Sequence, residues 1–148
     1  MNVTRESIHE ALYALGSGAA GLNFKSRILL HWDAVTPGQM PAFFQAYVGE
    51  TSKKVYRQPA IWTMNFRWYV YVHVENADDP NGPMSVMNPI IDALEKSLGP
   101  PPGYLGGDPQ TLGGLVSHAW LEGDIETDEG TLGQTAVAII PVNVVATS

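Results

Sequence analysis

The sequence predicts a single α+β domain over residues 1–148, with two helices packed on a mostly antiparallel sheet of about five strands. Three observations lead to this fold class. Residues 62–75 contain the strongest strand pattern of the chain, and two other segments carry apolar residues at helical spacing. The remaining strand-like segments follow one another without a repeating strand–helix unit. A chain of 148 residues is long enough to bury one sizeable core.

The segment 62–75 is expected to be the central strand of the sheet. From Phe66 onward, aromatic and β-branched residues alternate with a period of two, which is the signature of a strand. One face is wholly apolar and should lie on the core; it carries Phe66, Trp68, Val70, Val72 and Val74. The other face carries Arg67, Tyr69, Tyr71, His73 and Glu75. Its aromatic rings with polar tips suit a half-wetted surface, a contact with another chain, or burial under a helix.

Residues 4–15 are expected to form the first helix. Thr4 is a favoured N-cap residue, and Ile8, Leu12 and Leu15 fall on one apolar stripe. Glycines from Gly16 onward should end the helix.

Two strands are expected next, over residues 25–35 and 41–50, separated by a turn at Pro37-Gly38. In the second of them, Phe43 and Phe44 should point to opposite faces. Residues 51–59 then form a polar loop with the strongest local concentration of positive charge, which comprises Lys53, Lys54 and Arg57. This loop is interpreted either as a solvated hairpin tip or as a contact with a partner.

A second helix is expected over residues 85–98, beginning at Ser85 or, because of Pro89, nearer Asn88. The proline- and glycine-rich segment 99–110 follows as a long loop that contains Tyr104. The last part of the chain is expected to contain a strand over 112–125, an acidic hairpin tip over 124–130 and a strand over 135–146. Pro141 should place that last strand at a sheet edge or on a bulge.

The composition excludes several classes of protein. The chain has no cysteine, which excludes disulfides and thiolate metal sites and favours a cytoplasmic origin. It has no apolar run long enough to span a membrane and no signal-peptide layout. The net charge is -7, and the first 67 residues are net basic while the remainder is strongly acidic. This asymmetry indicates either a solvated acidic surface or a subunit with two unlike charged parts, and it argues against reading nucleic acid.

Candidate catalytic chemistry is sparse. The sequence has no phosphate-binding glycine loop and no serine in a nucleophile elbow. Three histidines fall on predicted strands, namely His31, His73 and His118, and each of the first two is followed two positions later by a carboxylate, Asp33 or Glu75. A histidine–carboxylate metal site is therefore conceivable, and simple packing or surface roles are the alternative.

Several short segments, in this order, resemble a known family. They are RILLHWDAV at 27–35, PAFF at 41–44, VGE at 48–50, WYVYV at 68–72, DP at 79–80, TLGGLV at 111–116, Gly123, EG at 129–130 and AIIPV at 138–142. Together they cover nearly the whole chain, and it resembles the tail terminator (tail completion, minor tail protein) family of long-tailed bacteriophages and their prophages. The resemblance implies a small α+β domain that forms a homohexameric ring, stops polymerisation of the tail tube and offers a surface for joining the head.

The resemblance also implies partners and excludes cofactors. The expected partners are other copies of the chain, the tail tube protein, head-completion or connector proteins, and genomic DNA that passes through the lumen without sequence-specific binding. No membrane, catalytic residue, metal or cofactor is expected, and the location would be the virion after assembly in the host cytoplasm. Candidate subunit-interface residues are Lys53, Lys54, Arg57, Tyr69, Tyr71 and Tyr104. The alternatives are a tail-tube or head-completion subunit and, from another class, a small metal-dependent hydrolase that uses His31, His73 or His118 with Glu75.

Overall fold

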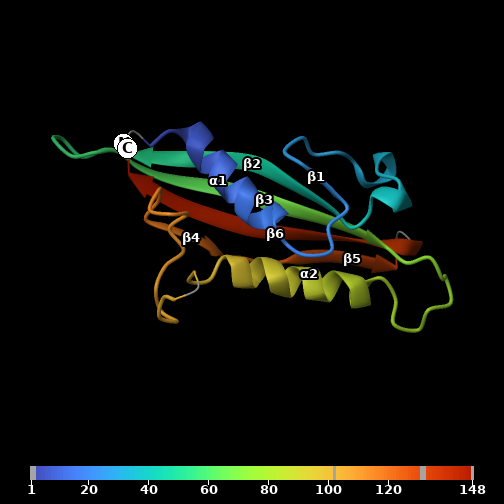
Figure 1. The fold of residues 1–148 in the computed structure, drawn as a ribbon. Helices are drawn as coiled ribbons and strands as arrows, with labels where there is room; N and C mark the ends of the chain where they lie inside the picture. The colour runs from blue at the N-terminus through green and yellow to red at the C-terminus, as the bar shows by residue number, and fades with distance from the viewer. Residues whose placement is uncertain (1–2, 102, 131–132, 148) are drawn as a thin grey trace.

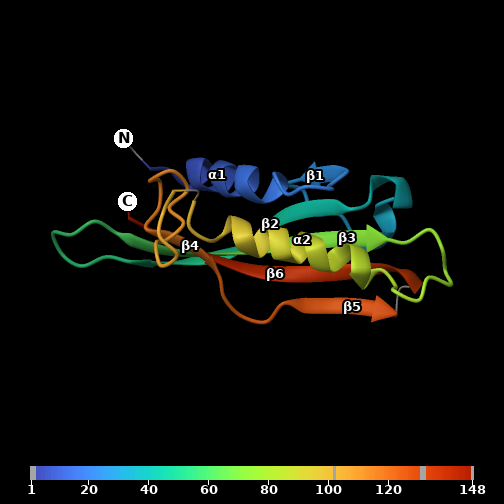
Figure 2. The ribbon, with the colours of Figure 1, turned by 60° about the horizontal axis from the view of Figure 1, so that its bottom comes forward.

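The computed structural model describes residues 3–101, 103–130 and 133–147, which form one mixed sheet with two helices on one face (Figures 1 and 2). The elements are α1 (Arg5–Ser17), β1 (Phe24–Ser26), the 3₁₀ turns η1 (Trp32–Ala34) and η2 (Pro37–Gln39), β2 (Ala42–Lys53), β3 (Ile61–His73), α2 (Met84–Ser97), β4 (His118–Leu121), β5 (Glu126–Gly130) and β6 (Gly133–Thr147). In this part of the chain no helix is long and apolar enough to cross a membrane.

The predicted α+β class is confirmed. The sheet has six strands in the order β1-β2-β3-β6-β4, and β5 also pairs with β6. Every pairing is antiparallel except that of β1 with β2. The two strands β4 and β5 lie end to end along the same edge of β6, as their registers show.

Strand β3 is central, as the alternating pattern predicts. It pairs with β2 on one side and with β6 on the other along its whole length. Its apolar face lies under the helices, where Phe66, Trp68, Val70 and Val72 are at most 1% exposed. Ile8 and Leu12 of α1, Met87 and Leu94 of α2 and alternate residues of β6 complete this core.

Helix α1 packs very closely on the sheet at its C-terminal end. Thr4 caps the helix as predicted, and Thr4 and Ser7 form a reciprocal capping box. Gly16 lies inside the helix rather than ending it, and it is buried. A Cβ atom at Gly16 would lie 2.6 Å from Phe43 Cζ and 2.8 Å from Trp68 Cζ2. Glycine therefore permits the close approach of α1 to two large, fully buried aromatic rings of the core.

Gln45 links α1 to the centre of the sheet. This side chain is buried, accepts a hydrogen bond from Trp68 Nε1 at 3.1 Å, and donates one from Nε2 to the His9 carbonyl at 3.0 Å. A buried indole N–H needs an acceptor, and Gln45 supplies one inside an otherwise apolar core.

Helix α2 begins earlier than Pro89 suggests. Its first residue is Met84, so the expected start near Asn88 is wrong, and Pro89 lies inside the helix on its exposed side. Ser85 does not cap the helix; its hydroxyl donates to the Gly82 carbonyl. The Met84 N–H instead donates to Glu129 Oε2 at 2.9 Å, so a carboxylate from β5 caps the helix from a distant part of the sequence.

The segment 25–35 is not a long strand, which corrects the expectation from its alternating pattern. Only β1 is extended, and the chain then passes through η1 and η2 over the face of the sheet opposite the helices, where Leu30 and Trp32 pack near Tyr71. This segment covers a second apolar cluster, which contains Val35, Met40, Ala42, Phe44 and Tyr71. The alternating pattern of Ile28, Leu30 and Trp32 therefore does not mark a strand, because this part of the chain pairs with no neighbouring strand among the described residues. Phe43 and Phe44 point to opposite faces, as predicted, and both are fully buried.

The predicted boundaries near the C-terminus are partly wrong. The strand expected over 112–125 is only four residues long, and most of the expected acidic hairpin tip over 124–130 is strand β5. Strand β6 has partners on both sides, so Pro141 is not on an edge strand. Pro141 instead lies opposite the break between β4 and β5, and a Cβ at Gly123, which has φ +116, would lie 3.3 Å from its Cγ. The missing N–H of Pro141 therefore coincides with the interruption of the neighbouring strand.

Candidate functional site

The histidines do not converge. Among the described residues, no group of three or more His, Asp or Glu side chains could hold a metal ion. His73 pairs with Thr135 and His118 with Val145 on β6, so their strand positions are about 33 Å apart at the usual rise per residue. His31 contacts Asp33 at 2.7 Å on the surface, and the ring of His118 stacks on Trp120 at 4.7 Å. These arrangements satisfy each histidine locally and give no support to the metal-dependent hydrolase.

The β2–β3 hairpin carries the predicted basic cluster. Strand β2 extends to Lys53, which pairs with Ile61, so the loop is shorter than expected. The tip is nevertheless exposed throughout residues 51–59 and projects beyond the end of the sheet (Figure 1). Tyr56 is 82% exposed, and the Arg57 guanidinium lies over its ring at 5.2 Å. The hairpin therefore presents a compact surface that is both aromatic and cationic.

Two other basic side chains of the N-terminal half, Arg5 and Arg27, are neutralised within the subunit. Arg5 forms a bidentate ion pair with Glu50, at 2.7 and 2.9 Å, and its guanidinium lies 4.2 Å from the Trp62 ring centre. The hydrogen bond from Arg5 and, to a lesser extent, the one from Tyr47 lower the pKa of the Glu50 carboxyl. Arg27 pairs with Glu6 in the same way. The charge of the hairpin tip is therefore the larger part of what the basic half can offer to a partner.

The two tyrosines of β3 differ in accessibility. Tyr71 is 4% exposed, its hydroxyl donates to the Leu30 carbonyl at 2.6 Å, and burial raises its pKa to about 12. Tyr69 is half-buried at the border of the second apolar cluster. Neither lies under a helix; the segment with η1 covers them from the opposite face. Tyr69 is thus the member of the pair that a neighbouring chain can reach.

Beyond Tyr69, the face of the sheet opposite the helices carries a half-buried set of mostly apolar residues on β6 and β4, with Arg67 exposed beside Pro141 and Asn143 beside Trp120. Strand β6 contributes Ile139, Pro141 and Val145, and β4 contributes Trp120 in the same layer, by register. Glu126 and Asp128 of β5 share this face and add an acidic border. The sequence did not reveal this surface because the positions of β4 and β5 depend on their common partner β6.

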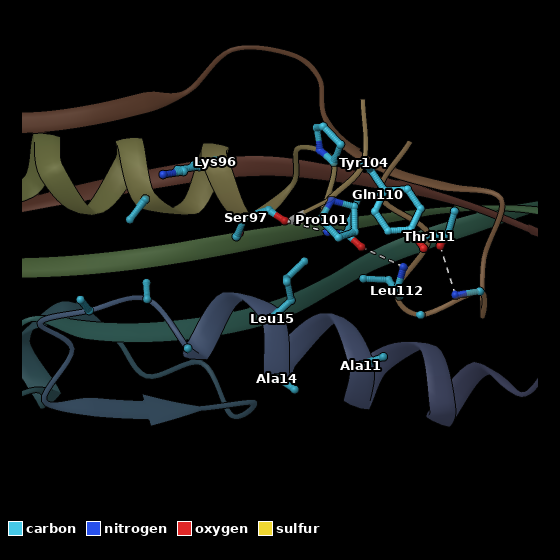
Figure 3. Close-up of a pocket in the computed structure, with 17 residues that line it drawn as sticks. Ala11, Ala14, Leu15, Lys96, Ser97, Pro101, Tyr104, Gln110, Thr111 and Leu112 are labelled. Atoms are coloured by element: carbon cyan, nitrogen blue, oxygen red, sulfur yellow. Dashed lines mark hydrogen bonds between the residues drawn. The ribbon is translucent and has the colours of Figure 1, made fainter. Parts of the chain in front are cut away.

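A groove of about 1250 Å³ lies between the helices and the loop that follows α2 (Figure 3). One wall is built from small or aliphatic residues of α1 and of the segment that follows it, namely Ala11, Ala14, Leu15, Gly18, Ala19 and Ala20. The opposite wall comes from α2 and from the loop, where Pro101, Tyr104 and Leu112 contribute. Tyr104 is 64% exposed, so a large ring stands at the mouth of the groove.

Gln110 holds the loop side of the groove in place. Its Nε2 donates to the carbonyls of Ser97 at 3.0 Å and Gly99 at 3.2 Å, and its Oε1 accepts from the Leu112 N–H at 3.1 Å. These bonds satisfy the last carbonyl of α2 and the Gly99 carbonyl just after the helix, and they fix the irregular loop against this end. Sequence reasoning missed Gln110 because a glutamine in a proline- and glycine-rich loop gives no signal of burial.

No protein-family profile matches the sequence, and no curated protein matches it. Among solved structures, a chain described as "Virion of native gene transfer agent (GTA) particle" has the same fold, with a TM-score of 0.55. The match covers 95% of this chain and 95% of that chain, at 12% sequence identity. At this identity the similarity establishes a shared fold over the whole domain.

Proposed function

We propose that this chain is a structural subunit of a phage-like virion, and specifically a tail terminator. Copies would close into a homohexameric ring at the end of the tail tube, stop its polymerisation and present the surface that head-completion proteins join. One observation carries this proposal: the fold matches a chain of a gene transfer agent virion along nearly its full length. The ordered sequence resemblance to tail terminators and the separation of the histidines point the same way.

The size of the domain suits a ring that surrounds DNA. A globule of 148 residues has a radius of gyration of about 15 Å and a diameter of roughly 35–40 Å. In a closed ring of six, the distance between neighbouring centres equals the radius of the ring. The central hole is then about one subunit wide, which is enough for a DNA duplex to pass.

The acidic balance of the chain also fits this role. With a net charge of -7, the ring would carry excess carboxylates, and a lumen lined by them would repel phosphate. DNA would slide through such a lumen instead of binding to it. The basic hairpin would then face an acidic protein surface, either on a neighbouring subunit or on the tail tube.

A head-to-tail ring needs two different patches on each subunit. Lys53, Lys54 and Arg57 form one candidate patch on the hairpin tip, while Tyr104 and the groove form another. Tyr69 and the apolar layer on β6 form a third, which would suit the axial contact with the tube or with a head-completion protein. Tyr71 would act from inside the subunit, supporting Tyr69 and the segment that carries η1.

A tail-tube or head-completion subunit is the second candidate, because a shared fold does not separate these roles. Light scattering and native mass spectrometry of the purified chain would distinguish them. A terminator should give a monomer or a closed species of six times the 16.0 kDa chain mass. Tail tubes assembled from added tube subunits should also be shorter in its presence than in its absence. Open stacks of indefinite length would identify a tube subunit and refute the terminator.

A further inference from the structure

A small hollow lies beside Tyr69 on the face of the sheet opposite the helices. We propose that the tip of the β2–β3 hairpin of one copy docks in this hollow of the next copy, with Tyr56 as the central side chain. This inference rests on the proposed ring and specifies its head-to-tail contact. It assigns the Tyr69 end of this face to the ring and leaves the stretch from Pro141 to Val145 for the axial contact.

The hollow is apolar and has room for one or two side chains. Its volume is about 420 Å³, near the lower end of the roughly 300–1,000 Å³ of typical ligand pockets. The residues that line it come from β3, β6 and the segment with η1, and include Leu29, Leu30, Trp32, Tyr69, Tyr71 and Ile139. Three aromatic rings therefore line the hollow, and an incoming tyrosine ring can pack edge-to-face against them.

Two carboxylates lie beside the hollow by strand register. Glu126 of β5 is paired with Ile139 of β6, and Asp128 is paired two positions further along with Val137. Directly paired residues point to the same face of a sheet, so both carboxylates flank residues that line the hollow. Among the described residues neither carboxylate forms an ion pair. Their charge is thus available to a cation from outside the subunit.

The border of the hollow is acidic when all its charged groups are counted. Asp33 contacts His31, which lines the hollow, at 2.7 Å, and adds a third carboxylate. Arg67 adds one cation, because it lies two positions before Tyr69 on the same face of β3 and is exposed. With His31 neutral, three carboxylates and one guanidinium surround the hollow.

The hairpin tip carries the complementary side chains. Tyr56 is 82% exposed, and the Arg57 guanidinium lies over its ring at 5.2 Å, so the ring and the charge approach a partner together. Lys53 and Lys54 add two more cations, and none of the three forms an ion pair in the part of the chain that the structure describes. An aromatic ring beside unpaired cations therefore meets an aromatic hollow beside unpaired carboxylates. Tyrosine and arginine are also the side chains that most often anchor protein interfaces.

The two surfaces lie toward opposite ends of the sheet, as a head-to-tail contact requires. The hairpin projects past the end of β3 at which Ile61 lies (Figure 1). From Ile61 to Tyr69 the strand rises about 27 Å at the usual rise per residue. A subunit thus cannot fill its own hollow with its own hairpin. Docking each tip in the next hollow uses both surfaces once per subunit, and a closed ring leaves neither unpaired.

Cross-linking tests the contact directly, because the natural chain has no cysteine. Val55 lies next to Tyr56 on the tip and is 49% exposed, and Leu29 lines the hollow and is 41% exposed. A short bis-maleimide should join Val55→Cys/Leu29→Cys into a ladder of species that ends at the closed ring, for the chain alone or on tail tubes. Mixing the two single variants should give dimers only. The matched control is Val55→Cys/Leu105→Cys, which should give no ladder although Leu105 is 79% exposed.

A charge exchange gives an independent readout. Arg57→Glu and Glu126→Arg should each weaken self-association by about two- to fivefold, and the two changes combined should restore most of the loss. Glu95→Arg is the matched control, since Glu95 is exposed on α2, on the other side of the sheet. Combined with Arg57→Glu, it should restore nothing.

The outcomes separate the contact from the proposed role. A ring of the expected mass in which Val55→Cys/Leu29→Cys cross-links no better than the control overturns the hairpin contact and leaves the terminator standing. Protection of Leu29→Cys from maleimide by tube subunits, without protection in the free ring, also overturns the contact, because the tube then fills the hollow. A ladder that continues into open stacks overturns the terminator and keeps the hairpin contact.

Discussion

Replacing Gly16 with alanine tests the close packing of α1 on the sheet. The new Cβ would lie 2.6 Å from Phe43 Cζ and 2.8 and 2.9 Å from two atoms of the Trp68 indole, closer than real Cβ atoms approach other heavy atoms. Phe43 and Trp68 are fully buried, so neither ring can swing into solvent. Helix α1 must therefore move away from the sheet.

The expected magnitude is the difference of two effects. Overpacking a well-packed core costs about 1–3 kcal/mol, and we take the upper end because two fixed rings are involved. Replacing glycine with alanine inside a helix stabilises the helix by about 1 kcal/mol. The free energy of unfolding should therefore fall by about 2 kcal/mol, which corresponds to a decrease in Tm of roughly 4–8 °C for a chain of this size.

Urea unfolding followed by tryptophan fluorescence measures this change. Gly38→Ala is the matched control, because its Cβ position has nothing within 4 Å. It should unfold within about 0.5 kcal/mol of the wild type. If Gly16→Ala is as stable as the wild type or more stable, the close approach of α1 is refuted.

Three further predictions follow from single side chains. Gln45→Leu should lower the free energy of unfolding by about 2 kcal/mol, because it leaves the Trp68 N–H without its acceptor; no loss in urea unfolding would contradict this. Gln110→Ala should raise amide hydrogen exchange in residues 99–114 while the β3 amides stay protected. Burial lowers the pKa of His9 below 6.5, so its contribution to stability is complete above that pH and is lost as the pH falls through its lower pKa in the folded protein. As the pH falls from 6.5 to about 4.5, where carboxylates begin to bind protons, the free energy of unfolding should therefore decrease in the wild type. The decrease should be smaller in His9→Gln.

The sequence predicts the elements whose patterns are local. Strand β3 shows its buried face through strict alternation, and α1 shows its cap and apolar stripe, so both were placed correctly. The same reasoning failed for residues 25–35, where an alternating pattern lies in a segment that has few strand neighbours. It also failed for the start of α2, because the cap comes from Glu129 on a distant strand.

The candidate surfaces also differ in whether the sequence alone reveals them. The basic hairpin was visible in the sequence because its three charges and its turn residues are adjacent. The groove was not, because its walls come from α1, α2 and the following loop, and its key residue Gln110 acts through hydrogen bonds to backbone carbonyls. Long-range packing thus decides which of the exposed residues can form an interface.

The length of tails in particles assembled without this chain tests the proposed role most directly. Deleting its gene and measuring the tails by negative-stain electron microscopy should show overlong tubes that lack heads, and supplying the wild-type chain should restore uniform length. Headed particles with tails of normal length in the deletion would contradict the claim that this chain ends the tube.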